Sequence, residues 1–309
     1  MIPIENVRDF PARARGAFVT VGNFDGVHRG HQHLLSRLRQ KADLAGAPAL
    51  AITFDPHPAT LLRPAQAPVP LVWPDREVRL LVEAGATEVG VFRTGPWLLG
   101  LTAREFFDRV IREQLGARGL VEGPNFAFGH DRAGDVTILR DWCAEEGIDF
   151  EVVEGTRIDG ELVSSSRIRR LLTTGDVVGS LALLSRPHRI RGAITRGAGR
   201  GAKLGFPTAN LTAIDTLIPA DGVYAAIAYI DGQGSGNPAA CHIGPNATFG
   251  EEARSVEAHL LDFSGDLYGR QVELDFLARL RGTRKFEGPD DLLRQVQADI
   301  EETRRIGSA

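Results

Sequence analysis

The chain has 309 residues, of which 43% are hydrophobic and 25% are charged, as in an ordinary globular protein. At about 100–200 residues per domain, this length predicts two domains. The 36 Lys and Arg residues are outnumbered by 40 Asp and Glu residues, giving a formal net charge of −4. This balance argues against a nucleic-acid partner, because nucleic-acid binding usually requires a basic surface.

The cysteine content and the absence of long apolar runs indicate a cytoplasmic location. Cys143 and Cys241 have no CxxC spacing, which argues against a disulfide framework or a structural zinc site. The N-terminus is charged and broken by prolines, unlike a signal peptide. No run approaches the roughly 18 apolar residues of a membrane span, so we expect no membrane partner.

The first half of the chain alternates short apolar runs with helical stretches. Residues 17–21, 48–54, 88–92 and 119–121 are the predicted strands. This alternation predicts a doubly wound α/β domain with a parallel sheet. Ligands of such sheets bind beyond the carboxyl ends of the strands, so the loops that follow residues 17–21 and 48–54 are candidate sites.

Two features predict helices in this half. Leu34, Leu35 and Leu38 share one helical face directly after the first candidate loop. Thr102 and Glu105 have the spacing of a capping box, which predicts that a helix begins there.

The second half predicts a small antiparallel barrel followed by a helix. Short strands are expected at 222–230, 238–244, 255–263 and 270–280, with Gly-rich turns and no helices between them. Residues 232–238 are expected to form a loop.

The closing helix begins at Pro289 and carries Leu292, Leu293, Val296 and Ile300 at helical spacing. The composition changes near residues 185–187, which predicts domains at 1–184 and 185–309.

The strongest chemical signal in the first half is His28 and His31, three residues apart between a predicted strand and a predicted helix. Helix N-termini present free N–H groups to phosphate, and an imidazole can donate to phosphate oxygens. A zinc pair or two surface histidines are the alternatives, but no third ligand has a usual zinc spacing.

These residues carry a resemblance to a known family. The HxGH signature at residues 28–31, preceded by GNFDG, resembles the nucleotidyltransferase superfamily and implies its Rossmann-like fold. The stretches FDPHP (54–58), GPNFAFGHDRAGD (123–135) and VSSSRIRRL (163–171) narrow the resemblance to FAD synthetases. It implies that the FMN phosphate attacks the α-phosphorus of ATP, yielding FAD and pyrophosphate.

The resemblance assigns roles to residues of the first half. His28, His31 and Arg169 are implied as catalytic, with His28 and His31 on the β- and γ-phosphates of ATP. The implied ATP-binding set is Gly22, Asn23, Phe24, Asp25, His28, Gly30, His31, Ser165, Ser166 and Arg169. The implied flavin-binding set is Asp55, Pro56, His57, Pro58 and Asn125.

Some of these residues also have simpler interpretations. Ser166 replaces the usual threonine of the family but keeps a hydroxyl. His57 could be part of a rigid turn only, Asp25 could be a turn residue, and Phe126 and Phe128 could be ordinary core residues.

The Gly-rich stretch 197–211, GAGRGAKLGFPTANL, is not a Walker P-loop, because neither GK nor a following Ser or Thr is present. It resembles the riboflavin kinase module, whose fold is a six-stranded antiparallel barrel. The implied nucleotide-binding residues are Gly197, Gly199, Gly201, Lys203, Thr208 and Asn210. Thr208 and Asn210 are the implied Mg²⁺ ligands, since both offer neutral oxygen atoms.

The stretch 255–260 supplies the candidate base of the kinase. Period-two alternation places Glu257 and His259 on one strand face, and the resemblance implies that Glu257 accepts the hydroxyl proton. Glu273 and Asp275 are expected to be solvent-facing strand residues. The stretch HIGPNATFG (242–250) departs from the family's usual SIGxNPTFG, with Ala247 in place of proline.

Together the two resemblances imply a bifunctional enzyme with riboflavin, FMN, FAD, ATP, ADP and pyrophosphate as ligands and Mg²⁺ as cofactor. Three alternatives stay open. Only one module is active and the other is a relic or a regulator, the protein is a non-enzymatic flavin-binding or flavin-sensing protein, or the nucleotidyltransferase acts on another phosphorylated substrate.

Overall fold

The structure, a computed structural model, describes residues 1–5, 9–197, 201, 205–245, 253–286 and 288–307. The chain divides into two compact units. The first is Met1–Val69 with Trp73–Ser164, and the second is Pro70–Val72 with Ser165–Ala309.

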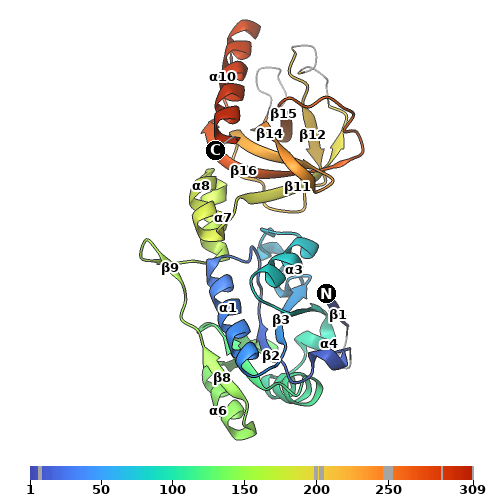
Figure 1. The fold of residues 1–309 in the computed structure, drawn as a ribbon, viewed down its shortest axis with the longest axis vertical. Coiled ribbons are helices and arrows are strands. Elements are labelled where there is room, and N and C mark those ends of the chain that lie inside the picture. Colours follow the sequence, from blue (N-terminus) through green and yellow to red (C-terminus); the bar gives the residue numbers. More distant parts are fainter. Residues whose placement is uncertain (6–8, 198–200, 202–204, 246–252, 287, 308–309) are drawn as a thin grey trace. The chain divides into compact units, whose positions relative to one another are not determined.

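A six-stranded parallel sheet with the order β1-β4-β3-β2-β5-β8 forms the centre of the first unit (Figure 1). The strands are β1 (Ile2–Ile4), β2 (Phe18–Val21), β3 (Ala49–Asp55), β4 (Glu88–Arg93), β5 (Gly119–Glu122) and β8 (Asp149–Val152). This confirms the parallel α/β fold and all four predicted strands. The strand order reverses between β2 and β5, the kind of switch point at which such sheets bind ligands.

Helices cover both faces of this sheet. The helices of the first unit are α1 (Arg29–Leu44), α2 (Pro58–Leu62), α3 (Pro74–Glu83), α4 (Pro96–Leu99), α5 (Ala103–Phe106), the π-helical η3 (Phe107–Gln114) and α6 (Val136–Glu146). Three short 3-10 turns are described: η1 (Ala12–Ala14), η2 (Pro64–Gln66) and η4 (His130–Arg132). In one small antiparallel pair, β6 (Ala127–Phe128) pairs with β7 (Gly134–Asp135). In the other, β9 (Arg157–Ile158) pairs with β10 (Glu161–Leu162). The apolar side chains of η3 and α6 share one core with β2, β3 and β4. Helix α1 packs on β2, β3 and β5 through Leu35, Leu38 and Ala42, which lie outside that core.

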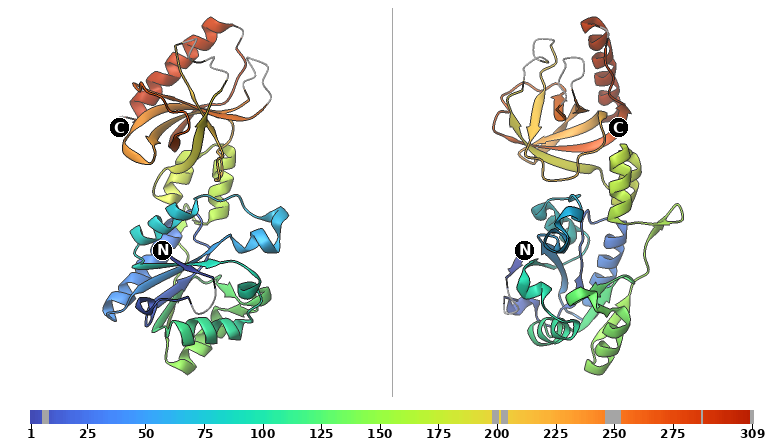
Figure 2. Two further views of the ribbon diagram at one scale, coloured as in Figure 1. Left: turned by 90° about the vertical axis from the view of Figure 1, so that its right-hand side faces the viewer. Right: turned by 180° about the vertical axis from the view of Figure 1, so that it is seen from behind.

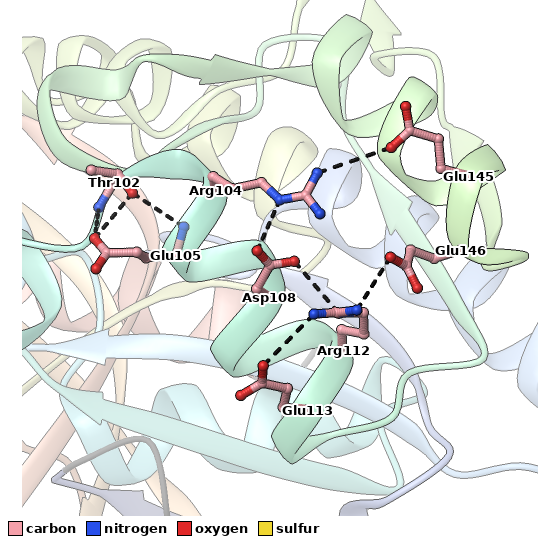
Figure 3. Close-up of polar contacts among 8 residues, drawn as sticks. All are labelled: Thr102, Arg104, Glu105, Asp108, Arg112, Glu113, Glu145 and Glu146. Atoms are coloured by element: carbon pink, nitrogen blue, oxygen red, sulfur yellow. Dashed lines mark hydrogen bonds and ion pairs between the residues drawn. The ribbon is translucent and has the colours of Figure 1, made fainter.

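The predicted capping box is present at the start of α5 (Figure 3). The Thr102 hydroxyl accepts from the Glu105 backbone N–H at 3.2 Å, and the Glu105 carboxylate accepts from the Thr102 N–H at 3.0 Å. Beyond it, Arg104 pairs with Asp108 at 2.8 Å and approaches Glu145 of α6 at 4.0 Å. The cap therefore opens a helical stretch that charged side chains connect to α6.

The second unit contains a closed antiparallel barrel with the order β11-β12-β15-β14-β13-β16. The strands are β11 (His188–Thr195), β12 (Ala209–Thr212), β13 (Gly222–Ile230), β14 (Gln233–Gly244), β15 (Ser255–Leu260) and β16 (Gln271–Arg281). Its helices are α7 (Ser165–Thr174), α8 (Val177–Leu184) and α10 (Pro289–Gly307). Figure 2 shows α10 lying along the outside of the barrel, where it contacts β13, β14 and β16. The six-stranded barrel and the closing helix are thereby confirmed.

The expectation of a loop at residues 232–238 is wrong, because β14 already begins at Gln233. Asp231 and Gly232 have φ angles of 52° and 67°, so two residues suffice for the connection from β13. An Asp-Gly pair with two positive φ angles matches the right-handed twist of paired strands. Gly234 and Gly236 lie within β14 at an irregularity in its pairing with β13, where their φ angles are 85° and 76°.

The expectation that Glu273 and Asp275 face solvent is also wrong, because both residues are buried and each is only 6% exposed. Arg189 of β11 donates to Asp275 Oδ1 at 2.5 Å and to Glu273 Oε2 at 2.8 Å. Its guanidinium also lies 4.2 Å from the centre of the Tyr229 ring. Neighbouring strands thus cover the outer face of β16 at these positions.

Both cysteines are buried free thiols, and burial raises the pKa of Cys143 to about 12. In the part of the chain that the structure describes, no helix combines the length and apolar character needed to cross a membrane.

Candidate functional site

The loop after β2 lies at the switch point of the sheet. Its backbone turns through Gly26, with a φ of 83°, and Val27, with a φ of 38°. A β-branched residue with positive φ is an outlier, and such strain concentrates at functional sites. The Val27 N–H donates to the Phe24 carbonyl at 2.7 Å, and Gln32 Nε2 donates to the Val27 carbonyl at 2.8 Å, which fix the turn.

The structure brings His28 and His31 together at the start of α1. Their rings stack with centroids 3.7 Å apart and planes inclined by 18°. His28 caps the helix, because its Nδ1 accepts from the His31 N–H at 3.3 Å. A Cβ atom on Gly30 would lie 3.1 Å from the His28 ring, so glycine leaves the room that this arrangement needs.

The other predicted residues of this loop differ in exposure. Asn23 is exposed and Gly22 is half-buried, whereas Phe24 and Asp25 are buried. The Phe24 ring packs edge-on against His31, with centroids 5.2 Å apart. Phe24 therefore supports the histidine pair from the inside of the loop.

The FDPHP stretch ends β3 and begins α2. His57 caps α2, because its Nδ1 accepts from the Ala59 N–H at 3.0 Å. The Pro56 carbonyl accepts from the Thr94 hydroxyl at 2.5 Å. Asp55, Pro56, His57 and Pro58 are all half-buried at the carboxyl end of β3, beside the end of β2.

Two acidic residues near these strand ends were not identified from the sequence. Glu77 of α3 accepts from the Thr53 hydroxyl at 2.5 Å, and burial raises its pKa to about 7, with further increases from the carboxylates of Asp25 and Asp55. In the sequence Glu77 looks like an ordinary acidic residue in the first turn of a helix.

The other is Glu122, which ends β5 and is only 2% exposed. It accepts from the Val21 N–H at 2.8 Å, just beyond the last paired residues of β2 and β5. Burial raises the pKa of Glu122 well above its ordinary value. In the sequence, the only indication of the contact between Glu122 and Val21 is that Glu122 is an acidic residue at the end of the apolar run before it.

The remaining adenylyltransferase candidates lie on other elements. Asn125 is exposed in the turn before β6. Ser165, Ser166 and Arg169 lie on α7, which belongs to the second unit. Ser165 and Arg169 are half-buried, and Ser166 is exposed.

In the barrel, the structure brings together the candidate base and the candidate metal ligands. The Thr208 hydroxyl donates to Glu257 Oε2 at 3.1 Å. Asn210 of β12 lies directly opposite Glu257 of β15. A hydroxyl, an amide oxygen and a carboxylate are oxygen ligands of the kind Mg²⁺ accepts, so this donor set fits the cation.

The Gly-rich segment lies against these residues where it is described. A Cβ on Gly197 would lie 2.3 Å from the Asn210 side-chain nitrogen, and one on Gly201 would lie 2.4 Å from the Phe206 carbonyl oxygen. A side chain at position 201 would therefore clash with backbone, whereas one at position 197 would displace the Asn210 side chain. Gly199, Lys203 and Ala247 lie outside the described residues.

Two family models match the chain, "FAD synthetase" at residues 10–167 and "Riboflavin kinase" at residues 184–307. A bifunctional riboflavin kinase/FMN adenylyltransferase from Pseudomonas fluorescens is 36% identical over 295 residues, covering 95% of this chain and 94% of that protein. One of the same name from Bacillus subtilis is 32% identical and covers 94% of this chain and 92% of its own length.

A crystal structure titled a macrolide-efflux protein, from Streptococcus pneumoniae, has a TM-score of 0.86 and 32% identity to this chain. The match covers 98% of both chains. The similarity therefore extends over both units.

Proposed function

Because the chain belongs to the bifunctional riboflavin kinase/FMN adenylyltransferase family, we propose that it makes FMN from riboflavin and ATP and then makes FAD from FMN and ATP. ADP leaves in the first reaction and pyrophosphate in the second. One observation carries the proposal: each unit holds its own cluster of side chains suited to phosphate chemistry, His28 with His31 in the first and Thr208 with Glu257 in the second.

In the adenylyltransferase, the FMN phosphate oxygen attacks the α-phosphorus of ATP as the bond to pyrophosphate breaks. His28 and His31 lie where the free N–H groups of α1 would also meet the phosphates. Donors placed at this position stabilise the charge that develops on the leaving pyrophosphate. The reaction needs no covalent enzyme intermediate, so positioning and charge stabilisation account for the role of these residues.

The remaining contacts of this half are proposed as follows. Gly22, Asn23, Phe24, Asp25 and Gly30 are proposed ATP contacts from the first unit, and Ser165, Ser166 and Arg169 of α7 are proposed as further ATP contacts. Arg169 contributes a guanidinium that can bind phosphate oxygens in a bidentate manner. Asp55, Pro56, His57, Pro58 and Asn125 form the flavin side.

In the kinase, Glu257 accepts the proton of the terminal ribityl hydroxyl as that oxygen attacks the γ-phosphorus of ATP. The Thr208 hydroxyl holds one carboxylate oxygen of Glu257, which fixes the direction of the other. We propose that Thr208 and Asn210 hold Mg²⁺, which would neutralise charge on the ATP phosphates. Gly197 and Gly201 let the backbone approach the nucleotide, and Gly199 and Lys203 complete the proposed nucleotide-binding set.

We also propose that the adenylyltransferase domain spans residues 1–184, that the kinase domain spans residues 185–309, and that the protein acts in the cytoplasm. A flavin carrier without catalysis would need neither the stacked histidines nor a carboxylate held by Thr208. An adenylyltransferase for another substrate would leave the barrel without a role.

The test supplies the purified chain with riboflavin, ATP and Mg²⁺ and follows FMN and FAD by chromatography. We expect FMN to form first and FAD after it. His28→Ala should lower FAD formation by at least about 100-fold and spare FMN formation, because it removes a donor to the developing charge. Glu257→Ala should have the opposite selectivity, with a loss of about 100-fold or more in FMN formation. Equal loss of both activities in either variant would contradict the assignment of two separate sites.

A further inference from the structure

A row of polar side chains crosses three strands of the barrel beside the proposed kinase base. In the strand register, Asn210 of β12 lies opposite Glu257 of β15, which in turn lies opposite His242 of β14. Their sequence neighbours Ala258 and Cys241 are fully buried inside the barrel. Since successive side chains of a strand point to opposite faces, all three members of the row lie on the outer face.

The carboxylate of Glu257 is already held from two directions. The Thr208 hydroxyl donates to Oε2 at 3.1 Å, and Ser255 Oγ lies 3.3 Å from Oε1. His242 lies directly opposite Glu257 on the paired strand β14. Side chains directly opposite each other in an antiparallel pair have Cβ atoms about 4.5–5.5 Å apart, within reach of an imidazole and a carboxylate.

His242 has an unused hydrogen-bonding atom at this position. Its Nδ1 is shielded from solvent and has no hydrogen-bond partner among the residues that the structure describes. A buried polar atom without a partner is uncommon in folded proteins, and a catalytic role is one of its recognised explanations.

Burial favours the neutral form of the His242 ring. Burial is the largest influence and lowers the pKa of His242, and Arg281 of β16 lowers it further, whereas Glu257 and Asp221 raise it. Asp299 of α10 pairs with Arg281 at 2.8 Å, which moderates that positive charge. A neutral imidazole carries one N–H donor, which can lie on Nδ1.

We propose that His242 is a positioning residue of the kinase, whose Nδ1 donates to Glu257 and orients the carboxylate when it turns toward the riboflavin hydroxyl. This inference rests on the proposed role of Glu257. In that state the imidazole of His242 on β14 joins the Thr208 hydroxyl, just before β12, and the Ser255 hydroxyl of β15 in setting the direction of the Glu257 carboxylate. Misdirection of a general base lowers the rate of the chemical step more than it weakens substrate binding.

Three substitutions separate this role from a merely structural one. His242→Asn places an amide nitrogen near the position of Nδ1, His242→Gln places one near Nε2, and His242→Phe keeps a ring without a donor. With riboflavin and ATP supplied to the full chain, we expect the kcat of FMN formation to fall about ten-fold or more in the Phe and Gln variants. The Asn variant should stay within about three-fold of the parent, and the KM for riboflavin should change less than about two-fold throughout.

FAD formation from supplied FMN is the internal control and should be unchanged in all three variants. Parent-like kcat in the Phe variant, rescue by Gln as complete as by Asn, or a rise in KM without loss of kcat would each overturn the inference. If the Phe variant fails to fold, the comparison between Asn and Gln decides. Failure of the parent chain to form FMN, or full FMN formation by Glu257→Gln, would instead contradict the proposed function.

Discussion

At the scale of single residues, the carboxyl of Glu77 couples the site region of the first unit to pH. Its pKa in the folded chain is about 7, raised by burial and by the carboxylates of Asp25 and Asp55, against an ordinary value of 4.5. Between these two values the folded chain keeps a proton that the unfolded chain releases. The contribution of Glu77 to stability is therefore complete below about pH 4.5 and is lost as the pH rises through about 7.

Glu77→Gln should remove this pH dependence, because the amide keeps an oxygen for the Thr53 hydroxyl but does not titrate. The difference between the two pKa values corresponds to about 3 kcal/mol in the free energy of unfolding. We expect the variant to gain stability over the parent between pH 5 and pH 8 by an amount of this order. Trp73, Trp97 and Trp142 are the three tryptophans of the chain and all lie in the first unit, so urea unfolding followed by tryptophan fluorescence reports on this unit.

Asp75→Asn is the matched control, since Asp75 lies on the same helix but is exposed. Its stability should follow that of the parent at both pH values. Parallel pH curves for Glu77→Gln and the parent would show that Glu77 has an ordinary pKa in the folded chain.

Residues whose role depends on local sequence could be predicted, and those that depend on the fold could not. Thr102 and Glu105 are three positions apart, and His28 and His31 follow a strand directly, so spacing alone was informative. Glu77 meets Thr53 across 24 positions, and Glu122 meets Val21 across 101 positions. Nothing in the local pattern around these acids distinguishes them from solvated ones.

At the scale of elements, ion pairs join β11 to β16, and a cation–π contact joins β11 to β13. Arg189 lies opposite Asp275, and Tyr229 lies opposite Glu273, in the two ladders that flank β16. The alternation of apolar and acidic residues in β16 correctly predicts which side chains point to each face of the strand. It does not predict which residues cover the outer face. That depends on which strands become neighbours when the barrel closes, and therefore Glu273 and Asp275 were wrongly expected in solvent.

Arg189→Met should destabilise the second unit by about 3–5 kcal/mol, because it leaves two buried carboxylates without their cation. Heat inactivation of FMN formation would measure the loss, and FAD formation from FMN should keep its parent midpoint. Adding Glu273→Gln and Asp275→Asn to Arg189→Met should recover much of the stability, since the buried charges are then gone.

Arg270→Met provides the control for this cluster. Arg270 pairs with Asp231 at 2.7 Å, but both side chains are 45% exposed, so we expect a change below about 1 kcal/mol. A loss for Arg189→Met no larger than that of the control would mean that the cluster contributes no more than a surface pair.

At the scale of the whole molecule, α7 and α8 are joined to the barrel by contacts that sequence composition did not reveal. The Ala220 N–H donates to the Leu172 carbonyl at 2.9 Å, and Arg279 donates to the Thr174 carbonyl at 3.3 Å. Helix α8 packs against β11 and β16. The change in composition near residues 185–187 marks where the β-rich sequence begins, whereas these contacts group residues from Ser165 onward with the barrel.

Two fragments test which residues the kinase unit requires. A fragment of residues 165–309 keeps α7 and α8, whereas one of residues 185–309 follows the boundary expected from composition. Leu183 and Leu184 of α8 are buried, and burying two leucines contributes about 3 kcal/mol or more, so we expect the longer fragment to be more stable by at least that amount. Thermal unfolding followed by circular dichroism, with FMN formation as the second readout, would make the comparison.

Both fragments lack Pro70, whose carbonyl accepts from the Leu217 N–H at 2.7 Å in the full chain, so the loss of that contact is common to both. The difference between them then depends on residues 165–184 alone. Equal unfolding temperatures and equal FMN formation would place the boundary at 184/185 and show that α7 and α8 add nothing to the barrel. A less stable short fragment would mean that the kinase unit begins at α7, the helix that also carries Arg169 of the proposed adenylyltransferase site.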